Sequence, residues 1–197
     1  MREAFAERSL NYVSKYNNYN ELELVKIKYG LEALYTIITK TLGILLISLF
    51  LKIFKETVLL MALYGTMRLF GHGIHAKKSS HCWIASIITY VAFPLLIKYF
   101  VIKKTAIICC WALSFISFAI WAPADTPKKP IVNKKKRILD KIITIIVSIF
   151  LLAIAIKSNN ILVNNCIFFS YIMSMITINP LTYKLFGIPF NNYKTFN

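Results

Sequence analysis

The sequence has few acidic residues and few residues that break helices. Its 197 residues include 8 Asp and Glu against 24 Lys and Arg, together with 6 Gly and 6 Pro. Charged residues make up only 16% of the chain, whereas 57% of it is hydrophobic and the mean hydropathy is +0.60. A water-soluble fold cannot bury so large an apolar fraction. The composition therefore excludes an ordinary globular protein and indicates a membrane protein.

Cysteine is also scarce. Three of the four cysteines, Cys109, Cys110 and Cys166, lie inside apolar segments, where cysteine behaves as a small hydrophobe. The adjacent pair would point in different directions on a helix. No disulfide framework is predicted, and Cys82 is the one cysteine in a polar setting.

The N-terminus lacks the apolar core of a signal peptide, so we expect no cleaved leader. The segment 1–30 instead contains residues that recur at helical spacing opposite Arg8 and Lys15, which predicts a short amphipathic helix on the membrane surface. This helix is expected to end at the Asn-rich NNYN sequence. The residues that recur are Phe5, Ser9, Tyr12, Val13 and Tyr16.

Several apolar stretches approach the roughly 20 residues that a helix needs to cross a bilayer. We predict an all-α, polytopic integral membrane protein with about six transmembrane helices, within a range of four to six, in a single membrane domain over residues 1–197. The weakest span is 57–71, which is short and is interpreted as either a tilted span or a re-entrant segment. The stretches are 34–54, 57–71, 82–102, 105–122, 142–156 and 161–182.

A long basic break at residues 123–140 predicts the orientation of the chain. By the positive-inside rule this loop belongs in the cytoplasm. Two predicted spans separate it from the polar loop 72–81, so both loops open on the same side. We therefore expect a multi-pass protein of the cell membrane with both loops in the cytoplasm.

The net charge of +16 does not indicate a nucleic-acid-binding protein. The basic residues lie at span ends and in one loop, and they do not form a groove with interleaved aromatic residues. Orientation in the membrane and contact with anionic lipids account for most of this charge.

The loop 72–81 and the residue after it hold the only concentration of chemically reactive side chains. All three histidines, His72, His75 and His81, lie here, next to Cys82. A cysteine attacks as its thiolate, which nearby cations, a histidine or a helix N-terminus favour. Ser79 or Ser80 is a plausible N-cap for the helix that follows, which would place Cys82 in its first turn.

Geometry restricts how His75 serves as a base. On a continuous helix, His75 and Cys82 would lie about 10 Å apart along the axis, too far for a hydrogen bond. The chain between them therefore has to fold back, and Gly73 supplies backbone freedom just before His75.

Other interpretations use the same residues. Cys82 at the head of a span can be purely structural. His72, His75, His81 and Cys82 could form a zinc site, although their spacing matches no defined zinc motif and HExxH is absent. A non-enzymatic transport or lipid-binding protein is a further alternative, but the spans contain no deep acidic residue that would couple ions.

Two motifs together resemble the accessory gene regulator B family, AgrB, over nearly the whole chain. Members often carry Gly-Gly where this chain has His72-Gly73. The first motif is Arg68-x4-Gly73-x-His75-Ala76-x5-Cys82, and the second is Ala122-Pro123-Ala124-Asp125-Thr126-Pro127-Lys128-Lys129-Pro130-Ile131.

The resemblance implies a cytoplasm-facing cysteine endopeptidase of quorum sensing, without a cofactor or metal. It would mature an AgrD-like propeptide into a cyclic autoinducing peptide, with Cys82 as nucleophile and His75 as base. The resemblance also suggests a homodimer.

The supporting residues have two interpretations each. Arg68 would bind a propeptide carboxylate or stabilise the oxyanion, or else anchor its segment at the interface. Asp125 would orient His75 as a third catalytic residue, or else shape a turn, which we favour. Lys128 and Lys129 would hold an acidic tail of the substrate, or else act only as inside-positive anchors.

Overall fold

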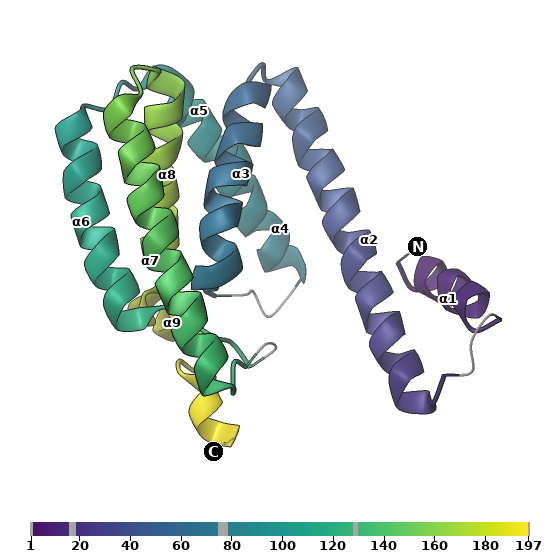
Figure 1. The fold of residues 1–197 in the computed structure, drawn as a ribbon. Coiled ribbons are helices and arrows are strands. Elements are labelled where there is room, and N and C mark those ends of the chain that lie inside the picture. The colour runs from purple at the N-terminus through teal and green to yellow at the C-terminus, as the bar shows by residue number, and fades with distance from the viewer. Residues whose placement is uncertain (1, 16–18, 75–78, 128–129, 197) are drawn as a thin grey trace. The chain divides into compact units, whose positions relative to one another are not determined.

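The computed structural model describes residues 2–15, 19–74, 79–127 and 130–196, without the side chains of residues 79–81 and 195–196. The chain divides into two compact units, Met1–Ile47 and Ser48–Asn197. Within the described ranges, helices and isolated bridge residues at His72, Ala124 and Thr126 are the only regular secondary structure, which confirms the all-α prediction. Figure 1 shows the order of the helices along the chain.

The first unit contains α1 (Arg2–Val13) and most of α2 (Glu21–Phe50). A reciprocal capping box begins α2: Glu23 N–H donates to Asn20 Oδ1 at 2.8 Å and Asn20 N–H donates to Glu23 Oε2 at 3.0 Å. This cap explains why α2 begins at Glu21, well before the apolar stretch 34–54 in which a span was predicted. A helix is present where the N-terminal helix was predicted, but α1 ends at Val13, before the NNYN sequence, and its place on the membrane surface stays a prediction.

The second unit is a helical bundle around α8 (Ile161–Ile178), which packs against α3, α5, α6 and α7. After α3 (Phe54–Gly71), three short elements make one span: α4 (Ser79–Ile87), the π-helical turn η1 (Ile88–Ala92) and α5 (Phe93–Tyr99). The remaining elements are α6 (Lys104–Trp121), α7 (Lys134–Lys157), α9 (Pro180–Leu185) and η2 (Asn192–Phe196).

Five helical segments of the described chain are long and apolar enough to cross a membrane: Glu21–Phe50, Cys82–Tyr99, Lys104–Trp121, Lys134–Lys157 and Ile161–Ile178. The segment 57–71 lies in α3, which is a continuous helix, and whether it is a tilted span or a re-entrant segment stays a prediction. It contacts α8 near both ends, since Cys166 Sγ lies 3.9 Å from the Glu56 carbonyl oxygen and Ile74 N–H donates to the Thr177 carbonyl at 2.9 Å. The 18 residues of α3 include Lys55, Glu56 and Arg68, whereas each of the five apolar segments contains an 18-residue stretch with at most 2 charged residues.

Pro94 explains the π-helical turn in the second span. Proline has no N–H, so the carbonyl of Tyr90, four residues earlier, loses its helical donor. The Thr57 hydroxyl of α3 donates to this carbonyl at 3.2 Å. A neighbouring helix thus satisfies the freed backbone group, as membrane helices with proline require.

Two loop predictions need correction at their boundaries. Residues 134–140 of the predicted loop 123–140 are the first turns of α7, because the Asn133 side chain caps them by accepting from Lys135 N–H at 2.9 Å and Lys136 N–H at 3.3 Å. Residues 79–81 of the predicted loop 72–81 belong to α4.

The two ends of the bundle differ in how the helices are joined. At one end, which we call the turn end, residues 51–53, 100–103 and 158–160 join successive helices. At the other, the loop end, residues 71–74, 122–127 and 179–194 come together. Figure 1 shows the C-terminal segment at the same end as the start of α4 and the start of α7.

Candidate functional site

The site is built where the end of α3 pairs with the loop after α6. Ala124 N–H donates to the Gly71 carbonyl at 3.1 Å, and Gly73 N–H donates to the Ala124 carbonyl at 2.9 Å. These bonds form a short parallel bridge between His72 and Ala124. The prediction that the two loops share one side is therefore confirmed.

Gly73 occupies a position where a side chain does not fit. Its φ is +116°, a conformation that L-residues rarely adopt, and an added Cβ would lie 3.0 Å from the Thr177 carbonyl oxygen. The backbone of Gly73 has to lie close to Thr177 because the next residue, Ile74, donates its N–H to the Thr177 carbonyl at 2.9 Å. The functional candidate Gly73 thus has a structural role: it lets the chain pass against the end of α8.

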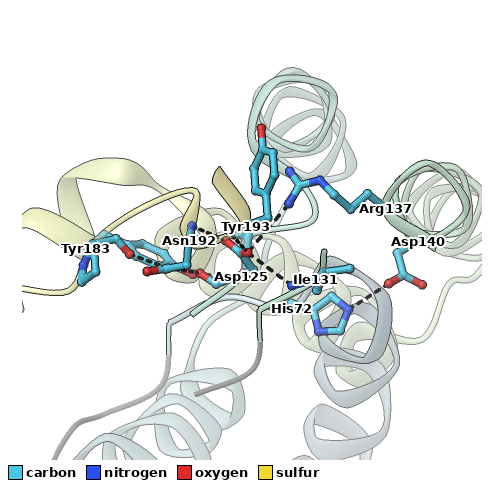
Figure 2. A network of polar contacts seen from close by, with 10 residues as sticks. His72, Asp125, Ile131, Arg137, Asp140, Tyr183, Asn192 and Tyr193 are labelled. Carbon is cyan, nitrogen blue, oxygen red and sulfur yellow. Dashed lines mark hydrogen bonds and ion pairs between the residues drawn. The ribbon is translucent and has the colours of Figure 1, made fainter. Parts of the chain in front are cut away.

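His72 also has a positive φ, +56°, and ends α3 by donating its N–H to the Arg68 carbonyl. Such a backbone strains a non-glycine residue, so the glycine that family members often carry would fit here without strain. In this chain the His72 ring gains a partner, since Nε2 lies 3.1 Å from Asp140 Oδ2 at a mostly buried position. Figure 2 shows the ring directed toward Asp140 of α7.

Arg68 fastens the backbone that leads to His75. Its guanidinium donates to the Tyr64 hydroxyl at 2.7 Å and to the Ile74 carbonyl at 2.5 Å. Arg68 therefore holds the carbonyl of Ile74, which is the last described residue before His75. Neither of its predicted roles, substrate binding or anchoring at the interface, anticipated this contact.

Asp125 is a buried hub, with 2% of its surface exposed. Its carboxylate accepts backbone N–H groups from Ile131 at 3.3 Å, Asn192 at 3.0 Å and Tyr193 at 2.9 Å. Arg137 of α7 lies 3.9 Å from the same carboxylate. Only the bond to Ile131 is local, and the choice between turn shaping and orientation of His75 stays a prediction because His75 lies outside the described residues. Figure 2 shows Asp125 between the C-terminal segment and α7.

The C-terminal segment was missed by the sequence reasoning. The Tyr183 hydroxyl donates to the Ala124 carbonyl at 3.1 Å, and the Asn192 side chain donates to the Asp125 carbonyl at 3.3 Å. Burial raises the pKa of the Tyr183 phenol and the nearby Asp125 carboxylate raises it further, so the hydroxyl stays protonated and keeps donating. No motif marks these residues, and only the tertiary fold brings them to the site.

Cys82 is the fourth residue of α4 and is partly exposed. The prediction that it lies in the first turn of a helix is therefore confirmed. Its predicted base His75, the basic residues Lys128 and Lys129, and the side chain of His81 lie outside the described part of the chain. The pairing of Cys82 with His75 and the expected bend between them therefore stay predictions.

The metal alternative is likewise untested. The described residues contain no group of three or more His, Cys, Asp or Glu side chains that could hold a metal ion. The residues that the zinc interpretation needs include His75 and the His81 side chain, which lie outside the described part of the chain.

The fold and the site together define a polytopic α-helical membrane protein with a cysteine in the first turn of one helix and two loops that bind one another through backbone hydrogen bonds. The family model described as accessory gene regulator B matches residues 6–178. The chain therefore belongs to the accessory gene regulator B (AgrB) family.

Individual relatives agree with this assignment. The chain is 29% identical over 184 residues to an AgrB-like protein of Clostridium acetobutylicum, covering 93% of this chain and 88% of that protein. It is 33% identical over 146 residues to accessory gene regulator protein B of Staphylococcus aureus, covering 73% and 78%, and 34% identical over 129 residues to that of Staphylococcus carnosus, covering 64% and 68%. No solved structure matches the chain.

Proposed function

We propose that this protein is a membrane-embedded cysteine endopeptidase that trims an AgrD-like propeptide and closes it into a cyclic autoinducing peptide for quorum sensing. The observation that supports this most is the fixing of the backbone directly before His75. Gly73 N–H donates to the Ala124 carbonyl, and Ile74 N–H donates to the Thr177 carbonyl. The Ile74 carbonyl in turn accepts a hydrogen bond from the Arg68 guanidinium. A general base must be held in a defined position to accept a proton, so the backbone before it has to be fixed. The partly exposed Cys82 lies in the first turn of the next helix.

The chemistry begins with transfer of the Cys82 thiol proton to His75. The thiolate attacks a peptide carbonyl of the propeptide, and a tetrahedral oxyanion forms. The C–N bond then breaks, the amine of the departing tail takes the proton from His75, and the N-terminal part of the propeptide remains on Cys82 as a thioester.

Ring closure regenerates the enzyme. A Cys or Ser side chain of the bound propeptide gives its proton to His75 and attacks the thioester carbonyl. A thiolactone or lactone forms, and Cys82 leaves as a thiolate that recovers the proton. An acceptor held close has a large effective concentration, and exclusion of water disfavours hydrolysis of the thioester.

The proposal includes an orientation and partners. The loop end faces the cytoplasm, because α7 begins there with Lys134, Lys135, Lys136 and Arg137. The substrate is the propeptide, whose acidic tail Lys128 and Lys129 attract, and the protein works as a homodimer.

Co-expression with the propeptide tests the proposal. Cys82→Ala and His75→Ala are expected to insert normally and to abolish cleavage, whereas Cys109→Ala, which removes an exposed cysteine of α6, is expected to cleave like the wild type. A Cys82→Ala protein that inserts and still cleaves would refute the proposal. Stoichiometric zinc in the purified protein, lost in His72→Gly, would instead favour the metal site.

A further inference from the structure

A pocket of about 480 Å³ opens at the loop end between the last turn of α6, the first turns of α7 and the C-terminal segment. It does not contain Cys82, and no step of the proposed reaction uses it. Aromatic and cationic side chains line it together. Those that carry the argument are Trp121, Arg137, Lys141 and Tyr193.

The two cations lie one helical turn apart on α7, so their side chains share a face. The Arg137 guanidinium lies 3.4 Å from the centroid of the Tyr193 ring, and Figure 2 shows the two side chains stacked. Stacking fixes the position of the guanidinium and leaves its edges available for hydrogen bonds. Lys141 donates to the Ala119 carbonyl at 2.7 Å and has two further N–H donors.

Arg137 lines the pocket and is held there by an ion pair with Asp125. Its Nη1 atom is buried and makes no hydrogen bond within the described residues. The nearest carboxylate, Asp125, lies 3.9 Å away and already accepts three backbone N–H groups. The pocket therefore combines the two positive charges of Arg137 and Lys141 with the further N–H donors of Lys141, which suits a phosphate group.

The mouth of the pocket favours a lipid over a soluble anion. Ile120 of α6 and Ile138 of α7 line it, and each is 62% exposed. Each begins an exposed apolar row along its helix, continued by Ile116 on α6 and Ile142 on α7. Trp121 lies at the end of the α6 span, the depth at which tryptophan concentrates in membrane proteins.

We propose that this pocket binds the phosphate headgroup of an anionic phospholipid. Arg137 and Lys141 bind the phosphate, and the acyl chains lie along the rows that begin at Ile120 and Ile138. Basic pockets between membrane helices bind anionic headgroups in this way. The bound lipid joins α7 to the C-terminal segment, and this role is independent of the proposed protease activity.

Binding to the purified full-length chain in detergent tests the proposal. Dioleoylphosphatidylglycerol is expected to raise the midpoint of thermal unfolding, whereas dioleoylphosphatidylcholine at the same concentration is expected to leave it nearly unchanged. Lys141→Gln is expected to weaken phosphatidylglycerol binding about fivefold, the effect of one basic residue near an anionic surface. The matched control is Lys134→Gln, which removes the same charge from an exposed position of α7 outside the pocket and should change binding less than twofold.

Each other outcome overturns the proposal. Equal weakening by Lys134→Gln and Lys141→Gln would mean that phosphatidylglycerol responds only to surface charge. Equal stabilisation by phosphatidylcholine would remove the selectivity for anionic lipid. A Lys141-dependent shift produced by inorganic phosphate alone, or displacement of phosphatidylglycerol by an acidic peptide, would assign the pocket to a soluble ligand. A further variant, Arg137→Lys, keeps the positive charge. Measuring both its lipid binding and its midpoint of thermal unfolding separates loss of binding from loss of folding.

Discussion

The two ends of the bundle differ in the kind of contact that holds their connecting segments. At the turn end, single side chains close short connections: Asn165 of α8 donates to the Ile97 and Phe100 carbonyls and accepts from Ile102 N–H, and Lys104 donates to the Ile156 carbonyl. At the loop end, backbone segments bind one another around a buried carboxylate, Asp125. The turn end only joins helices, whereas the loop end also fixes residues 71–74, which directly precede the predicted base His75.

This difference predicts that mutations at the two ends affect stability and activity differently. A defect at the turn end loosens the connections between helices and lowers stability. A defect at the loop end also displaces the segment that precedes His75, so it lowers activity even in molecules that remain folded. Stability and cleavage, measured on the same preparations, distinguish the two ends.

The largest effect is expected for Asp125→Asn. The amide offers one acceptor oxygen in place of two and leaves a buried N–H without a partner, so unfolding becomes about 3 kcal/mol easier. Cleavage per folded molecule should fall at least tenfold. Asn165→Ala at the turn end is expected to cost about 2–3 kcal/mol of stability with unchanged cleavage per folded molecule. Equal loss of activity in the two variants would refute the distinction between the ends.

Gly73→Ala comes next. A methyl group 3.0 Å from the Thr177 carbonyl, on a backbone with φ of +116°, is expected to cost about 2 kcal/mol and to reduce cleavage. The control is Gly65→Ala in the middle of α3, where nothing lies within 4 Å of the new methyl group. That variant should be neutral or more stable by up to about 1 kcal/mol, since alanine favours helix. Thermal unfolding and cleavage, measured on both variants, show whether the cost is specific to position 73.

Arg68→Lys tests the fastening of Ile74. Lysine keeps the charge but cannot hold the Tyr64 hydroxyl and the Ile74 carbonyl together, so we expect a several-fold fall in cleavage and a loss of about 1 kcal/mol of stability. Tyr64→Phe removes only the first of these partners and should retain most of the activity. If Tyr64→Phe is as impaired as Arg68→Lys, the bond to Ile74 is not what matters.

The smallest net effect is expected for His72→Gly. Relief of the backbone strain at φ +56° gains roughly 1 kcal/mol, while loss of the contact with buried Asp140 costs a similar amount. Adding Asp140→Asn should then make the protein more stable than His72→Gly alone, because the carboxylate that lost its His72 partner is removed. A double variant that is less stable than His72→Gly alone would contradict this balance.

Much of the fold follows from local patterns. Apolar length identified the helices, and the positions of two spans between the loops placed both loops at one end. Boundaries were less accurate where a cap lies outside the apolar stretch, as with Asn20 before α2 and Asn133 before α7. Such caps act through one side chain and leave hydropathy unchanged.

The site was harder to predict than the fold. The motif residues Arg68, Gly73 and Asp125 were identified, but their partners are Ile74, Thr177 and the C-terminal segment. Those partners bond mainly through backbone groups, which every residue type has. Sequence therefore cannot reveal these contacts, and the role of Asn192 and Tyr193 emerges only from the folded chain.

Trapping the acyl-enzyme tests the central claim most directly. The purified protein is incubated with a propeptide whose ring-closing Cys or Ser is replaced by Ala, so that the thioester cannot be resolved by cyclisation. Intact-mass analysis is expected to show the N-terminal fragment attached to Cys82 through a bond that hydroxylamine cleaves, and no adduct on Cys82→Ala. Release of the tail without any adduct on Cys82, or an unchanged adduct on Cys82→Ala, would contradict the assignment of Cys82 as the nucleophile.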